Sequence, residues 1–112
     1  MLIWIMKWKI TYYNDDVTDA IKAWPKGIKS KFLRTIDLIE EHGAQLRPPM
    51  TDYLGDGLFE IRVKAQEGIG RAFFCYVLKQ EIVILHAIIK KTQKTPQKEL
   101  KLAKNRMKEV KS

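Results

Sequence analysis

Three segments in the second half of the chain have the pattern of β-strands, and only two very short breaks separate them. Residues 58–64 alternate between apolar and charged side chains, residues 69–78 are mostly apolar and aromatic, and residues 82–89 (IVILHAII) are strongly β-prone. The breaks at 65–68 and 79–81 are long enough only for hairpin turns. The spacing therefore predicts an antiparallel sheet in which these strands are consecutive neighbours.

The first half of the chain predicts another strand and two helices. Residues 7–13 alternate with a period of two, which is typical of a half-buried strand. Asn14 can cap a short helix over about 16–23. A second helix is predicted over 28–42, ended by Gly43, because one apolar stripe runs along it: Ile28, Phe32, Ile36 and Ile39.

Two further segments complete the predicted fold. Residues 44–57 contain two prolines and two glycines and are expected to form a loop. Thr95 and Pro96 are a good N-cap and first-turn pair for a last, C-terminal helix. The order β-α-α-β-β-β-α predicts one α+β domain over residues 1–112, with a mainly antiparallel four-stranded sheet and the helices segregated to one side.

The N-terminus and the scarcity of metal-ligating residues limit the class of protein. The apolar stretch 1–6 is too short for a signal peptide or a membrane span, so we expect a cytoplasmic protein. Met6 is an equally good start, which would make residues 1–5 a dispensable extension. With a lone Cys75 and two histidines, we expect no internal disulfide and no structural zinc site. No cofactor is expected either.

The charge is strongly one-sided. The chain has 21 Lys and Arg against 13 Asp and Glu, a net charge of +8. From Lys90 onward there are nine basic and two acidic residues, so +7 of the +8 lies in that segment. This distribution favours a polyanionic partner, either a nucleic acid or an acidic protein.

The strand register predicts a cluster of charged side chains. An even-numbered turn within 65–68 places Arg62 directly opposite Arg71, and like charges facing each other destabilise a strand pair. We therefore expect both guanidiniums to point into water or to await an anion at one exposed spot. A two-residue turn at Lys79-Gln80 would complete one face of the sheet, formed by Glu60, Arg62, Lys64, Arg71, Phe73, His86 and Lys90. An odd-numbered turn would break this grouping.

Plainer interpretations of these residues stay open. Arg62 and Lys64 also suit the solvated face of an edge strand, and Arg71 also suits a surface salt bridge with Glu60. His86 lies between apolar residues, where a core histidine is more common than a catalytic one.

Three stretches resemble the HigB-like, phage-associated branch of the RelE/ParE toxin superfamily. They are LGDGLFEIRV, GIGRAFFCYV and IVILHAIIKKTQKTPQKELKLAKNRM, and the segment IIKKTQKTPQKEL is the most specific. The resemblance implies a RelE-like fold and the toxin of a type II toxin–antitoxin pair, neutralised by a cognate antitoxin of the helix-turn-helix type. It also implies a metal-independent endoribonuclease that cuts mRNA on the ribosome.

The resemblance also implies roles for individual residues. Arg71 matches an arginine that would clamp the phosphate, and Arg62 lies where relatives carry a basic residue. Lys91, or its neighbour Lys90, ends the last strand where relatives place another cation. Further contacts to RNA phosphates are expected from lysines in and after these strands: Lys64, Lys90, Lys94 and Lys98.

The proton-transfer residue is left open at this stage. Glu60 stands where ribosome-dependent RelE-type toxins have a lysine, and two nearby arginines would stabilise its carboxylate and weaken it as a base. His86 is the other candidate, because imidazole transfers protons near neutral pH. Charge stabilisation without a strong base is a third possibility.

Two other functions compete with the ribonuclease. One is a gyrase-targeting toxin of the ParE type, which binds a protein–DNA complex and cuts no RNA. The other is a non-catalytic, basic RNA-binding phage accessory protein, whose affinity would fall steeply with salt.

Overall fold

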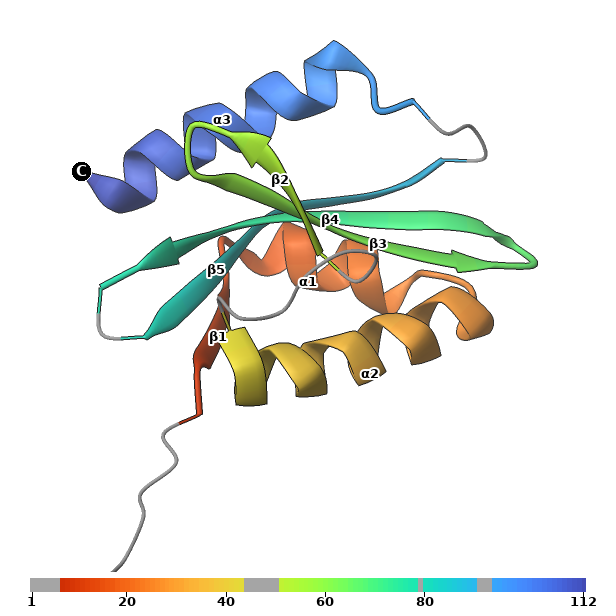
Figure 1. Cartoon of the computed structure of the whole chain (residues 1–112). Helices are drawn as coiled ribbons and strands as arrows, with labels where there is room; N and C mark the ends of the chain where they lie inside the picture. Colours follow the sequence, from red (N-terminus) through yellow and green to blue (C-terminus); the bar gives the residue numbers. More distant parts are fainter. Residues whose placement is uncertain (1–6, 44–50, 79, 91–93) are drawn as a thin grey trace, which may run out of the picture.

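The computed structural model describes residues 7–43, 51–78, 80–90 and 94–112 (Figure 1). The predicted extension 1–5 and residues 44–50 of the predicted loop 44–57 lie outside these residues. The elements follow the order β1 (Lys9–Tyr12), α1 (Asp15–Lys22), α2 (Lys26–His42), β2 (Thr51–Gly55), β3 (Leu58–Ala65), β4 (Gly68–Val77), β5 (Glu81–Lys90) and α3 (Gln97–Lys111).

The strands form one sheet in the order β1-β5-β4-β3-β2, in which β1 runs parallel to β5 and the other pairs are antiparallel. The predicted α+β class and the mainly antiparallel sheet are confirmed. The predicted strand count is wrong, because Thr51–Gly55 is a fifth strand. It joins β3 through Asp56 and Gly57, whose φ angles of 55° and 90° suit the tight turn that an Asp-Gly pair favours.

The helices cover both faces of the sheet, not one side as predicted. Figure 1 shows α1 and α2 on one face, called here the hairpin face, and α3 on the other, called the α3 face. The physical reason lies in the central strands β4 and β5, which carry large apolar side chains on both faces. A sheet of this kind needs a covering layer on each side to keep those side chains from water.

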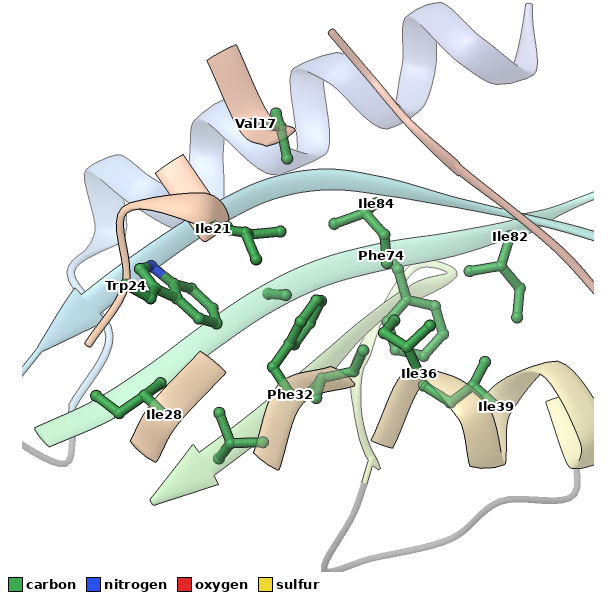
Figure 2. Close-up of a cluster of buried hydrophobic side chains, with 14 residues drawn as sticks. Val17, Ile21, Trp24, Ile28, Phe32, Ile36, Ile39, Phe74, Ile82 and Ile84 are labelled. Carbon is green, nitrogen blue, oxygen red and sulfur yellow. The ribbon is translucent and has the colours of Figure 1, made fainter. Parts of the chain in front are cut away.

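Two apolar cores result from this arrangement. Figure 2 shows the core of the hairpin face, where Trp24, Ile28, Phe32, Ile36 and Ile39 pack on Phe74, Ile82 and Ile84 of the sheet. The predicted stripe of the second helix is therefore confirmed. A smaller core lies under α3 and contains Leu58, Phe73, Cys75, Val83, Leu85, Ala103 and Met107.

Candidate functional site

The β3–β4 hairpin has the predicted register. Ala65 pairs with Gly68, which leaves a two-residue turn, and Arg62 lies directly opposite Arg71. The apolar residues that alternate with them, such as Ile61 and Ala72, face the hairpin core as predicted. The two arginines therefore point to the α3 face from adjoining strands.

The β4–β5 hairpin reaches the predicted pairs by a different route. Val77 pairs with Glu81, so the turn has three residues and the predicted two-residue turn is wrong. Further along, the register shifts by one residue at Leu85, because Phe74 pairs with Ile84 and Phe73 with His86. This bulge compensates for the odd turn, since it lets two consecutive residues of β5 project to the α3 face.

Helix α3 holds this bulge from above. Nη1 of Arg106 donates a hydrogen bond of 2.9 Å to the carbonyl oxygen of Leu85, and its guanidinium lies 4.6 Å from the centre of the Tyr13 ring. The phenol of Tyr13 in turn donates to the carboxylate of Glu109, also in α3. A backbone carbonyl displaced from the strand ladder thus acquires a charged donor.

The predicted grouping on the sheet is present as three rows across β3, β4 and β5. The rows are Glu60–Phe73–His86, Arg62–Arg71–Ile88 and Lys64–Ile69–Lys90. Successive rows are about 7 Å apart, since they are two residues apart along a strand. The start of α3 lies over the first row, through contacts of Thr95 and Glu99 described below.

Both arginines converge on one internal carboxylate. Nη2 of Arg62 lies 3.0 Å from Oε1 of Glu60, and Nη1 of Arg71 lies 3.5 Å from Oε2. Thr95, which precedes α3, donates to the same Oε2 at 3.3 Å. We call Glu60, Arg62 and Arg71 the arginine–glutamate cluster; its formal charge is +1.

Burial divides this cluster into an inner pair and one outer member. The side chains of Arg71 and Glu60 are 0% and 1% exposed, whereas that of Arg62 is 41% exposed. The prediction that both guanidiniums share an exposed spot is therefore wrong for Arg71. A buried arginine is stable when a carboxylate accompanies it, and Glu60 provides that charge.

His86 is held from two sides. Its ring stacks on Phe73 with 6.1 Å between ring centres, and its Nε2 lies 3.3 Å from Oε2 of Glu99 in α3. The side chain is 15% exposed, so it is neither fully buried in the core nor open to solvent. A carboxylate beside an imidazole fixes the orientation of the ring.

The predicted lysines differ in burial. Lys64, Lys94 and Lys98 are exposed, and Lys90 is half-buried at the end of β5. Lys91 lies outside the described residues. Lys64 and Lys90 thus place positive charge in the third row, two rows from Glu60.

Sequence patterns did not identify three residues that shape this site. Thr95 was expected to cap α3, but Pro96 occupies the N-cap position and the Thr95 hydroxyl bonds to Glu60 instead. Glu99 and Arg106 looked like ordinary members of a charged helix, and no local signal separates them from their neighbours. Their contacts depend on how α3 lies across the sheet.

Within the ranges that the structure covers, no three His, Cys, Asp or Glu side chains gather as a metal-binding group. No helix in these same ranges is long and apolar enough to cross a membrane.

Comparison with known proteins identifies the fold first. The crystal structure of an archaeal RelE–RelB complex from Pyrococcus horikoshii OT3 contains a chain that matches with a TM-score of 0.57. The two are 19% identical, and the match covers 80% of this chain and 100% of that chain. The fold is therefore RelE-like. No curated protein sequence matches the chain.

A family model then matches residues 19–108, most of the chain, under the description Phage derived protein Gp49-like (DUF891). The chain belongs to this phage-derived Gp49-like family, which is of the RelE and HigB toxin type. The resemblance found in the sequence is thus confirmed.

Proposed function

We propose that this chain is the toxin of a toxin–antitoxin pair and acts as an endoribonuclease on mRNA, on the ribosome, until a cognate antitoxin neutralises it. The observation that carries this proposal is the α3 face itself, where an outward guanidinium, a half-buried histidine and flanking lysines share neighbouring rows of one sheet. Such a surface suits a phosphodiester that must be bound and polarised.

In the proposed reaction the 2′-hydroxyl of a ribose attacks the adjacent phosphorus. The bond from phosphorus to the 5′-oxygen of the next nucleotide breaks, which leaves a 2′,3′-cyclic phosphate and a free 5′-hydroxyl. One proton leaves the attacking 2′-oxygen and one reaches the departing 5′-oxygen. The chemistry needs cations at the phosphate and a group that transfers protons, with no redox partner.

Arg62 is the residue to which we assign the phosphate. It is the exposed member of the arginine–glutamate cluster, and a guanidinium can bind two phosphate oxygens at once. Arg71 is assigned a positioning role in place of the predicted clamp, because its side chain is fully buried against Glu60. Glu60, whose carboxylate already accepts bonds from three side chains, orients both arginines.

His86 is our choice for proton transfer over Glu60. The imidazole is 15% exposed and the Glu60 carboxylate 1%, so only the histidine is partly accessible to a ribose. Glu99 holds the imidazole at 3.3 Å. Lys64, Lys90, Lys94 and Lys98, together with Lys91, would contact further RNA phosphates.

The test maps the 5′ ends of cellular RNA after brief expression of the wild type, Arg62→Ala, His86→Ala and a control, Lys26→Ala. Lys26 is an exposed cation at the start of α2 on the other side of the sheet. We expect new RNA ends and growth arrest with the wild type and the control. Both should be lost with Arg62→Ala and strongly reduced with His86→Ala, with circular dichroism showing that each variant is folded.

The other outcomes separate the competing functions. Growth arrest with DNA damage but without new RNA ends would favour a gyrase-targeting toxin. An absence of arrest with salt-sensitive RNA binding would favour a non-catalytic binding protein. Arrest by a folded Arg62→Ala at the wild-type level would refute the assigned site.

A further inference from the structure

A groove of about 300 Å³ lies where α2 meets the outer edge of β3. Its lining consists of Lys31, Arg34, Thr35 and Leu38 from α2 and residues 62–64 from β3. Helix α2 covers the hairpin face, so the α2 side of the groove lies away from α3. Arg62 nevertheless belongs to both places, because it also pairs with Glu60 on the α3 face.

The lining of the groove is cationic. Four of its seven residues are Lys31, Arg34, Arg62 and Lys64, and none is acidic. Within the described parts of the chain, one carboxylate forms an ion pair with any of these four cations: Glu60, which pairs with Arg62. Like charges gathered in this way repel one another, and an anion placed between them relieves that repulsion.

The local architecture holds these cations together. Nζ of Lys31 donates a hydrogen bond of 2.5 Å to the carbonyl oxygen of Lys64, which fixes α2 against β3 at this point. Lys31 and Arg34 are three residues apart on the helix and therefore project from the same side. Strand β2 pairs with β3 only as far as Ile61, so no described strand covers Arg62–Ala65 along that edge.

We infer that this groove binds phosphates of single-stranded RNA next to the nucleotide that is cleaved, an inference that rests on the proposed function. A polynucleotide carries one negative charge per nucleotide, so a strand whose scissile phosphate lies at Arg62 brings a neighbouring phosphate to the next cations. Arg34 offers the planar fork that phosphate oxygens accept, and Leu38 offers an apolar surface for a sugar or a base. The RNA path thus crosses the edge of β3, from the α3 face to α2.

The test measures binding of a short fluorescent oligouridylate with 2′-O-methyl riboses, which lack the attacking hydroxyl, over a series of salt concentrations. The double variant Lys31→Gln/Arg34→Gln is compared with Lys22→Gln/Lys26→Gln, which removes the same charge from exposed helix positions outside the groove. Losing two phosphate contacts should lower the slope of log affinity against log salt by about 1.4, about 0.7 for each. The control double variant should keep the wild-type slope.

Three outcomes would overturn the inference, and they are distinguishable. If both double variants lower the slope equally, the groove is no different from the rest of the basic surface. A polyglutamate peptide is titrated as a second probe. If only the affinity for this peptide falls in the groove variant, the groove binds acidic protein instead of RNA. If the wild type itself does not bind the oligonucleotide, the groove inference fails, and the mapped RNA ends decide the proposed ribonuclease function separately. Wild-type binding without a groove effect likewise refutes the groove alone.

Discussion

Glu60 and Arg71 form an ion pair inside the protein, with 3.5 Å between Oε2 of the carboxylate and Nη1 of the guanidinium and both side chains buried. This pair fixes the exposed Arg62, since the same carboxylate accepts from it on its other oxygen. The charge that the sheet presents to a substrate is therefore organised around an internal anion.

The buried pair should make a large contribution to folding. Glu60→Gln keeps the shape of the side chain but removes the negative charge beside Arg71, and breaking a buried ion pair costs about 3–5 kcal/mol. Urea denaturation followed by circular dichroism measures this loss. Arg62→Ala is the matched control and should cost less than about 1 kcal/mol, because its side chain is 41% exposed and its ion pair is partly screened by solvent.

The companion variant removes both buried charges at once. Glu60→Leu/Arg71→Met should be much more stable than Glu60→Gln, since no buried charge is then left without its partner. It should still be inactive, because Arg62 would lose the carboxylate that holds it. Equal stability of Glu60→Gln and the wild type would contradict this account of the pair.

Arg106 should control the position of His86. Arg106→Leu removes the charged donor from the carbonyl of Leu85, and hydrogen bonds to charged groups contribute about 1.5–3 kcal/mol. We expect a loss of that size in the free energy of unfolding and a clear change in the NMR signals of the His86 ring. Lys108→Leu, an exposed position on the same helix, should change neither.

The contact between Tyr13 and α3 should make stability depend on pH in alkaline solution. The pKa of Tyr13 is raised above its ordinary value of 10.0, mainly by the hydrogen bond to Glu109 and next by burial. The positive charge of Arg106 lowers this pKa in part. The folded state thus holds the phenol proton more tightly than the unfolded state. Stabilisation is full below pH 10 and is lost as the pH rises through the folded-state pKa.

The measurement compares melting temperatures of the wild type and Tyr13→Phe between neutral and strongly alkaline pH. The difference between the two proteins should be constant up to about pH 10 and shrink above it. A difference that does not change with pH would show that the Tyr13 hydroxyl does not contribute through its proton.

Gly70 should tolerate no side chain, because the α1–α2 hairpin packs directly on it. A Cβ at this position would lie 2.6 Å from Cγ2 of Ile28 and 3.0 Å from Cζ3 of Trp24. Overpacking of this kind costs about 1–3 kcal/mol, which thermal or urea unfolding of Gly70→Ala would measure. The double variant Gly70→Ala/Ile28→Ala should lose less stability than the sum of the two single variants; simple additivity would argue against the contact.

The strand register was accessible from the sequence for a local reason. A turn of even length and a strict period of two fix which side chains face one another, so the opposition of Arg62 and Arg71 followed from counting residues. The pairing of Phe73 with His86 was also predicted, but on a two-residue turn that does not exist. The bulge at Leu85 corrects for the odd turn, and no local pattern marks it, because Arg106 holds it from a distant helix.

Strand β2 was not predicted, because a loop was expected over residues 44–57. The Asp56-Gly57 pair is a strong hairpin signal, and it outweighed the nearby prolines that favoured a loop.

Hydrophobic periodicity and short turns are local properties of the chain. They determined the antiparallel core of the sheet, the helical stripe and the alignment of the charged rows. Tertiary structure decided how deep each charge lies. The sequence cannot show that α3 crosses the opposite face, where Thr95 contacts Glu60 and Glu99 contacts His86. Nor can it show that Arg71 is buried while Arg62 is exposed. Burial is set by which distant segment covers a residue, and that depends on packing of the whole chain.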